Sequence, residues 1–130
     1  MDCIFCKITD GTIPSKKIWE DDQFLAFLDI NPITSGHTLL IPKKHIDNIF
    51  DLDAATYSGL FDTAKKISNT ITKAMHAKRM GMMVEGFLVP HAHLHLIPLK
   101  KASEFSSARA KHVSSEELDF VVEKIRNELK

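Results

Sequence analysis

The sequence predicts an α+β fold, with an antiparallel sheet of about five strands, one long helix and a C-terminal helix. Strand-like segments stand before and after a single long amphipathic stretch, whereas a doubly wound fold would alternate strands with several helices. The length of 130 residues suits one domain, and 44% hydrophobic with 26% charged residues is typical of globular proteins. We therefore expect residues 1–98 to form the main domain and residues 99–130 to add a loop and a helix packed on it.

The first two strands are expected on either side of a turn. Residues 24–30 (FLAFLDI) are apolar at nearly every position, which fits a strand buried on both faces or a short buried helix. Asn31 and Pro32 follow as a turn signal and favour the strand. After a Ser-Gly break, residues 37–42 (HTLLIP) form the second strand candidate.

The clearest helix is expected over residues 54–77. Asp53 suits its N-cap, because the carboxylate can accept a free backbone N–H of the first turn. Lys78 and Arg79 complement the negative C-terminal end of the helix dipole. Apolar side chains recur at the three- and four-residue spacing of one helical face, at Tyr57, Leu60, Phe61, Ala64, Ile67, Ile71, Ala74 and Met75.

Two more strands and a last helix complete the predicted order. Residues 81–89 and 91–97 are strand-like, and residues 100–113 have the low periodicity of a loop. The last helix is expected to begin at Ser114, because Ser114 and Glu117 have the spacing of a capping box. The apolar face of this helix comprises Leu118, Val121, Val122, Ile125 and Leu129.

Composition excludes several classes of partner. Lys+Arg and Asp+Glu both number 17, so the basic excess typical of nucleic-acid binding is absent. No apolar run approaches the length of about 18 residues that a membrane helix needs. The N-terminal sequence MDCIFCKITD lacks the pattern of a signal peptide. We therefore expect a cytoplasmic protein that binds neither nucleic acid nor membrane.

Three alternating histidines carry most of the chemical information. On a strand, His91, His93 and His95 would share one face, about 6.5–7 Å apart, with apolar residues between them on the other face. Burying three imidazoles only for packing would waste their polar capacity, so the pattern indicates a metal site or a nucleophile site. Neutral imidazole is abundant at pH 7 and can attack phosphorus without a separate base.

The order of several motifs resembles the histidine-triad family of nucleotide-binding proteins. The resemblance runs from residue 3 to about residue 98 and covers most of the chain. Its motifs are, in order, CIFCKI at 3–8, IP at 13–14, EDD at 20–22, FLAFLDI at 24–30, GHTLLIPKKH at 36–45 and HAHLHLIP at 91–98.

The resemblance implies an antiparallel sheet with a long helix, a homodimer, and chemistry at the α-phosphate of a purine nucleotide. It implies that His93 is the nucleophile, which forms a nucleotidyl-histidine that water hydrolyses, and that His37 and His95 complete the phosphate site. Asp29 matches the residue that binds the ribose hydroxyls, although on its own it also suits a turn. The walls of the purine pocket would be Ile4, Phe5, Ile8, Phe27 and Ile30, which without the resemblance fit an ordinary core.

The cysteine pair has a common zinc-binding spacing. Cys3 and Cys6 supply two thiolates, and the resemblance implies that His45 and His91 complete a structural Zn²⁺ site. Three alternatives stay open from the residues alone. The cysteines could be metal-free packing residues or a redox pair, or zinc could bind the three alternating histidines as a catalytic metal.

The resemblance implies an enzyme, a nucleotide phosphoramidase that releases AMP from adenosine 5′-phosphoramidate-type substrates. A dinucleoside polyphosphate hydrolase is the second reading, although that branch tends to carry glutamine in place of the third histidine, here His95. A purine-nucleotide-binding module with little catalysis is the third. It is favoured by the short segment before His91, where Val84 stands at the family's asparagine position and several loop residues are missing.

Overall fold

The computed structural model describes residues 3–129; residues 1, 2 and 130, which the expected domain ranges include, lie outside it. Its centre is a five-stranded antiparallel sheet with strand order β1-β2-β3-β5-β4. The α+β class and the strand number are therefore confirmed. The strands are β1 (Lys17–Glu20), β2 (Phe24–Leu28), β3 (Thr38–Pro42), β4 (Arg79–Met83) and β5 (Leu94–Leu99).

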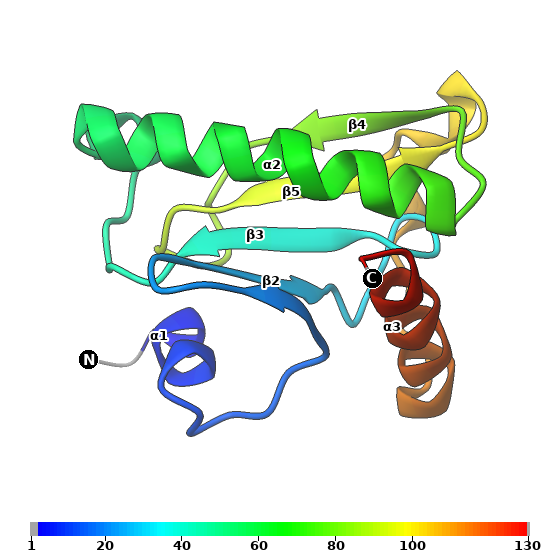
Figure 1. The fold of residues 1–130 in the computed structure, drawn as a ribbon, viewed down its shortest axis with the longest axis horizontal. Coiled ribbons are helices and arrows are strands. Elements are labelled where there is room, and N and C mark those ends of the chain that lie inside the picture. Colours follow the sequence, from blue (N-terminus) through cyan, green and yellow to red (C-terminus); the bar gives the residue numbers. More distant parts are fainter. Residues whose placement is uncertain (1–2, 130) are drawn as a thin grey trace.

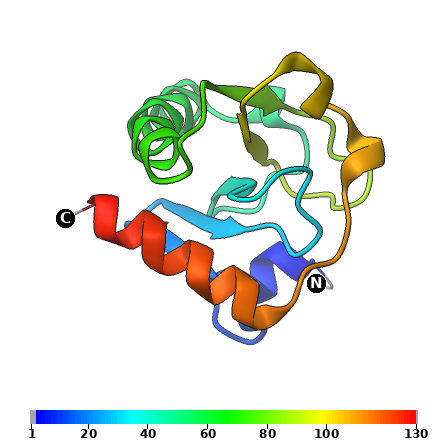
Figure 2. The same cartoon turned by 90° about the vertical axis from the view of Figure 1, so that its right-hand side faces the viewer.

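Three helices surround this sheet. Helix α2 (Ala54–Ala74) covers one face, α1 (Ile4–Thr9) lies on the opposite side, and α3 (Ser115–Leu129) packs beside β1 (Figures 1 and 2). Short 3-10 helices occur at Ile49–Asp51, Ala102–Glu104 and Ser107–Arg109, so the expected loop at 100–113 holds two of them. None of the described helices is both long and apolar enough to cross a membrane.

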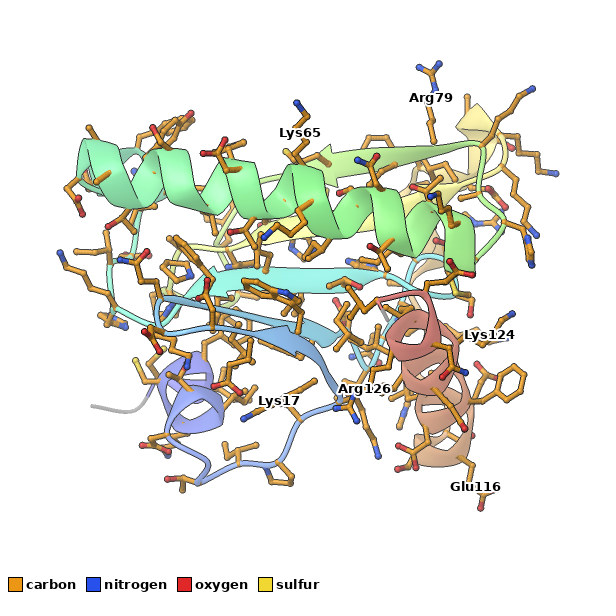
Figure 3. The ribbon with its side chains drawn as sticks, in the orientation of Figure 1. Lys17, Lys65, Arg79, Glu116, Lys124 and Arg126 are labelled. Carbon is orange, nitrogen blue, oxygen red and sulfur yellow. The ribbon has the colours of Figure 1, made fainter. Side chains whose placement is uncertain are left out.

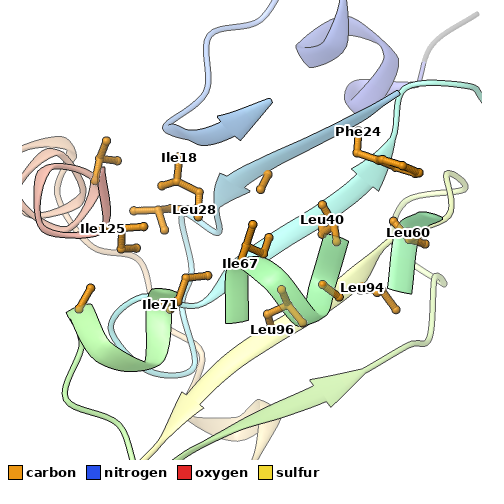
Figure 4. Packing of buried hydrophobic residues seen from close by; sticks show 14 of the residues in the cluster. Ile18, Phe24, Leu28, Leu40, Leu60, Ile67, Ile71, Leu94, Leu96 and Ile125 are labelled. Atoms are coloured by element: carbon orange, nitrogen blue, oxygen red, sulfur yellow. The ribbon is translucent and has the colours of Figure 1, made fainter. Parts of the chain in front are cut away.

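Strand β2 is buried on both faces, as its apolar run predicts, and this divides the interior in two. Phe24, Ala26 and Leu28 point toward α2 and belong to the main core. Leu25 and Phe27 point the other way, toward α1. Figure 4 shows the main core, which also contains Leu40, Leu60, Ile67, Ile71, Leu94 and Leu96.

Helix α2 begins as predicted and ends earlier. The Asp53 carboxylate accepts the Thr56 backbone N–H at 3.2 Å, which confirms the N-cap. The helix stops at Ala74 instead of residue 77, because His76 takes a left-handed φ of 54°. Lys78 N–H then donates to Leu99 O at 2.8 Å, which begins the pairing of β4 with β5.

The bounds predicted for the last two strands, which flank and include the histidines at 91–95, are wrong. The strand expected over 81–89 is β4 at Arg79–Met83, and the one expected over 91–97 is β5 at Leu94–Leu99. Between them the backbone leaves the sheet, and Ala92 N–H donates to Ile46 O at 2.6 Å instead of to a neighbouring strand. His91 and His93 therefore precede β5.

The turn after β2 also starts earlier than the apolar run suggests. Asp29 and Ile30 lie beyond the strand, and His37 lies just before β3. Asp29 N–H donates to His37 O at 3.0 Å, which closes the turn. Gly36 makes this close approach possible, because its φ is 94° and a Cβ there would lie 2.7 Å from Met75 Cγ.

Helix α3 belongs to the main core. Its buried Val121 and Ile125 join the cluster under α2, and Ser114 Oγ accepts the Glu117 N–H at 3.1 Å, which confirms the N-terminal half of the predicted capping box. Arg126 reaches from α3 and donates to Lys17 O at 2.6 Å (Figure 3). No hydrophobic period indicates α1 or β1 in the sequence, because both elements are too short to show one.

We predict that Ile125→Ala lowers the free energy of unfolding of the whole domain by about 2–4 kcal/mol, because it opens a cavity in the shared core. Ile125 is only 1% exposed, whereas Phe120 on the same helix is 64% exposed, so Phe120→Ala is the matched control. Urea denaturation should show one transition, shifted in Ile125→Ala and nearly unchanged in Phe120→Ala. An unchanged midpoint in Ile125→Ala would mean that α3 folds apart from the main domain.

Candidate active site

A cavity of about 540 Å³ lies on the α1 side of the sheet. His93 and His95 stand at one end, next to the carboxylate of Asp29. Its apolar walls include all five residues expected there. Phe5, Ile8 and Phe27 are buried in this wall. Ile4 and Ile30 are 45% and 56% exposed, so they form its solvent-exposed parts.

A backbone carbonyl fixes the tautomer of His93. Its Nδ1 lies 2.7 Å from His91 O, and since a carbonyl only accepts, Nδ1 must carry the proton and donate. In the neutral ring, Nε2 then has a free lone pair. The ring is held edge-on against Phe5, with centroids 5.1 Å apart, and the side chain is only 5% exposed. His93 is thus an oriented imidazole with an unprotonated nitrogen available for attack.

A second chain of hydrogen bonds orients His37 and His95. The Ile33 backbone N–H donates to His37 Nδ1 at 3.0 Å, so the proton of neutral His37 is on Nε2. Nε2–H then donates to His95 Nδ1 at 2.9 Å. The proton of His95 is left on its own Nε2, where it can donate to a bound group.

Both rings are neutral at physiological pH. Burial, reinforced by His95, lowers the pKa of His37 from 6.5 to about 3. Burial, reinforced by His93, lowers the pKa of His95 to about 4. The contact between His37 Nε2 and Asp29 Oδ2 at 3.6 Å is therefore not an ion pair, because His37 carries no charge.

Asp29 presents a carboxylate beside these rings. One oxygen accepts the Asn31 N–H at 2.8 Å, as its turn role predicts. Burial raises the pKa of Asp29, while the Asn31 N–H and nearby His93 oppose that rise. The second oxygen remains available to accept hydrogen bonds from ligand hydroxyls.

The cysteine pair meets the two expected histidines. Cys6 Sγ lies 3.2 Å from His45 Nδ1 and 3.5 Å from His91 Nδ1, and the two Nδ1 atoms are 3.3 Å apart. Cys3 Sγ is 3.5 Å from His91 Nδ1. In a tetrahedral zinc site with bonds of about 2.0–2.3 Å, the ligand atoms lie about 3.3–3.8 Å from one another. These distances therefore fit a single Zn²⁺ ion.

The hydrogen bonding and protonation of His91 also fit a metal ligand. Its Nε2–H donates to Pro42 O at 2.7 Å, which leaves Nδ1 unprotonated and directed at the sulfurs. Burial lowers the pKa of His91, which favours the neutral form that metals bind. The expectation of three evenly spaced rings on one strand face is wrong, because Nδ1 of His91 belongs to the cysteine cluster. The rings of His93 and His95 are 5.0 Å apart.

Sequence reasoning missed several residues that line the cavity. Glu85 lies in the loop that replaces the expected strand, and its carboxylate comes within 4.8 Å of ring nitrogens of His93 and His95. Leu88 and Val89 of the same loop line the cavity as well. Ser15, Lys16 and Ser115 contribute polar groups. Only the short loop before His91 signalled that this region is unusual.

Known proteins define the class to which this fold and site belong. Residues 10–102 match the sequence-family model of the HIT domain. The chain therefore belongs to the HIT domain family.

Named relatives include enzymes that act on adenosine nucleotides. An adenosine 5′-monophosphoramidase of Schizosaccharomyces pombe is 34% identical over 135 residues, with 100% of both chains covered. An adenylylsulfatase of Arabidopsis thaliana is 36% identical over 105 residues, which is 77% of this chain and 53% of that protein. The crystal structure of a zinc-bound histidine triad family protein from Mycobacterium smegmatis superposes with a TM-score of 0.86 at 30% identity. It covers 99% of this chain and 94% of that one.

The neutral His37 predicts an acid-dependent loss of stability. The unfolded chain takes up a proton at His37 below a pKa of 6.5, whereas the folded protein does so only near 3. Because the unfolded state binds more protons, the free energy of unfolding falls as the pH drops below about 6.5. In His37→Gln, the loss between pH 7 and pH 5 should be smaller by about 2 kcal/mol.

Denaturation at the two pH values measures this difference, with zinc present throughout. His112→Gln serves as the control, because His112 is exposed and lies outside the cavity. Equal acid sensitivity in His37→Gln and wild type would contradict the assignment.

Proposed function

We propose that this protein hydrolyses purine nucleotides at the α-phosphate, with His93 as the nucleophile. The observation that carries the proposal is the pair of oriented rings: His93 offers an unprotonated Nε2, and His95 offers an Nε2–H beside it. A nucleophile next to a hydrogen-bond donor suits attack on a phosphoryl group, whose oxygens gain charge in the transition state. Because the His91 carbonyl holds His93 and the backbone-bound His37 holds His95, little reorganisation is needed for reaction.

The reaction proceeds in two displacements. His93 Nε2 forms a bond to phosphorus while the P–N bond breaks, and the leaving amine takes a proton from solvent water, to which the second step returns one. Water then attacks the nucleotidyl-histidine, which releases the nucleoside monophosphate and restores neutral His93. His95, held by His37, donates to a phosphate oxygen in both steps.

The remaining residues bind the nucleoside. Asp29 accepts hydrogen bonds from the ribose hydroxyls, since a carboxylate can accept two at once. The purine lies among the apolar side chains of the cavity wall, which bury its faces: Ile4, Phe5, Ile8, Phe27 and Ile30. A cavity of about 540 Å³ is within the usual range for small-molecule sites.

Adenosine 5′-phosphoramidate is the substrate class we favour. The adenosine 5′-monophosphoramidase relative, which aligns over its full length, supports this choice. Hydrolysis of dinucleoside polyphosphates is the second candidate, and His95 in the third histidine position counts against it. A binding module with little catalysis is favoured only by the short loop before His91, which brings Glu85 rather than an amide to the histidines.

We predict that His93→Ala lowers kcat for adenosine 5′-phosphoramidate by about 10³-fold or more, because no other group replaces the nucleophile. AMP binding, measured by calorimetry, should stay within a few-fold of wild type. His112→Ala, at an exposed histidine, should retain full activity. If wild type binds AMP without turnover of any phosphoramidate, the binding module is correct instead. Faster turnover of a diadenosine polyphosphate would favour the second candidate.

We also propose that Cys3, Cys6, His45 and His91 hold one structural Zn²⁺ ion. The four ligand atoms, the hydrogen bond from His91 Nε2 to Pro42 O, and the neutral state of His91 support this assignment. Bound zinc would cross-link the N-terminal helix to the residues before β5. That link holds Phe5 against the ring of His93, so zinc acts on the site through structure.

Metal analysis should find about one zinc per chain in the wild type and much less in Cys3→Ala or Cys6→Ala. Both variants should also melt at a lower temperature, because zinc binding contributes to folding. His93→Ala is the matched control, since it removes a histidine beside the cluster that is not a ligand. Full zinc content in the cysteine variants, or loss of zinc in His93→Ala, would contradict the ligand set.

The homodimer and the cytoplasmic location expected from the sequence stay predictions. Strand β4 forms one edge of the sheet, and Met82 on it is 42% exposed. An open strand edge with apolar side chains is a common surface for pairing with a second copy.

A further inference from the structure

We propose that Lys16, together with Ser15 and Ser115, contacts the edge of the purine base and makes the protein prefer guanine to adenine nucleotides. This inference rests on the proposed function and revises one part of it, the base: adenosine 5′-phosphoramidate remains a substrate, and the guanosine compound is the better one. All three residues line the cavity that contains the catalytic histidines, and none of them has a role in the reaction steps above.

Strand order places these residues at the base end of the cavity. His95 is on β5, and the pairing runs from His95 to Leu39, from Leu39 to Phe27 and from Phe27 to Lys17. Three strand spacings separate β5 from β1, or about 14 Å. Lys16 immediately precedes β1, so a ligand with its phosphate at His95 extends its base toward Lys16.

Asp29 lies between the two ends, as a ribose-binding group should. It follows β2 directly, and β2 stands between β1 and β3. The backbone of Lys16 meets this strand, where Leu28 N–H donates to Lys16 O at 3.0 Å. The phosphate would therefore contact the histidines, the ribose would contact the carboxylate of Asp29, and the base would contact Lys16. This is the order in which the three parts follow one another in a nucleotide.

Lys16 is held in place by the C-terminal helix. Its Nζ donates to Asp119 Oδ1 at 2.7 Å, and its side chain is 28% exposed. An ammonium group has three N–H donors and no acceptor, so donors remain after one is used by Asp119. Asp119 is a positioning residue: it restricts a flexible side chain at the rim of the cavity.

Ser15 adds a polar atom that lacks a partner. Its Oγ is buried, and within residues 3–129 nothing hydrogen-bonds to it. Buried polar atoms without partners are uncommon, and one in the wall of a cavity is explained when a ligand supplies the partner. Ser115, the first residue of α3, places a second hydroxyl on the same cavity.

These donors match guanine better than adenine. Guanine presents two acceptors, O6 and N7, on one edge, whereas adenine presents the N7 acceptor beside the N6 amino donor. Lys16 can donate to both O6 and N7 of guanine. In adenine, the lysine would face the N6 amino group, which is itself a donor and cannot accept its hydrogen bond. The serine hydroxyls can donate or accept, so the lysine sets the direction of the preference.

This arrangement gives the C-terminal segment a function. Ser115 and Asp119 lie outside residues 10–102, the part that matches the HIT domain. The helix that completes the hydrophobic core would thus also complete the nucleotide pocket. Base preference in this chain would depend on Ser15 and Lys16 inside the matched region and on Ser115 and Asp119 outside it.

Binding of AMP, GMP and inosine 5′-monophosphate to the zinc-loaded protein tests the inference. GMP should bind about tenfold more tightly than AMP, which is the discrimination expected of one lysine on O6 and N7. Inosine 5′-monophosphate, which has O6 but no 2-amino group, should bind like GMP. The kcat/KM ratio for guanosine and adenosine 5′-phosphoramidates should show the same preference.

The variants separate base reading from other effects. Lys16→Met keeps the apolar stem, so the GMP to AMP ratio should fall to near one while AMP binding changes less than twofold. Ser15→Ala and Asp119→Asn should each reduce the ratio in part. Lys44→Met, which removes a lysine outside the cavity, should leave the ratio unchanged.

Two outcomes would overturn the inference. They are a wild-type ratio of one or less, and a ratio unchanged in Lys16→Met; equal losses for both nucleotides in that variant would mean that the lysine contacts ribose or phosphate. In each case the proposed function stands if the nucleotides bind. If neither nucleotide binds to wild type, the proposed function is wrong and this inference fails with it.

Discussion

The site depends on backbone groups that each occupy one nitrogen of a buried imidazole. Pro42 O accepts a hydrogen bond from His91 Nε2–H, His91 O accepts one from His93 Nδ1–H, and Ile33 N–H donates to His37 Nδ1. A neutral imidazole has one donor and one acceptor, so fixing one nitrogen fixes the other. Three rings close together thereby present three different faces: an Nδ1 directed at the cysteine sulfurs, a free Nε2 in the cavity and a relay to a further donor.

The two-sided sheet makes such a site possible in a small protein. One face of β2 and β3 packs under α2 and supplies the hydrophobic core, while the opposite face supports α1 and the cavity. Alternation of side chains along a strand lets one five-residue segment serve both purposes. The packed face fixes the backbone of the strands, and the other face can therefore hold functional groups in defined positions.

Functional side chains gather where strands end. Asp29 follows β2, His37 precedes β3, and both His91 and His93 precede β5. Irregular backbone frees carbonyl and N–H groups from sheet pairing, and two of these groups, His91 O and Ile33 N–H, orient imidazoles. The strands supply position, and the residues just outside them supply hydrogen bonds that a regular ladder would have consumed.

Local patterns in the sequence determined the class of the fold, the long helix with its Asp53 cap, the buried strand of β2 and the residue types of both sites. These features depend on residues that are close together in the chain and on the spacing of apolar residues, and both can be read directly from a sequence. Only the tertiary structure decided that residues 84–93 leave the sheet and that Lys16 meets a helix about a hundred residues away. Contacts between segments far apart in the chain depend on how the core packs, and no local pattern encodes them.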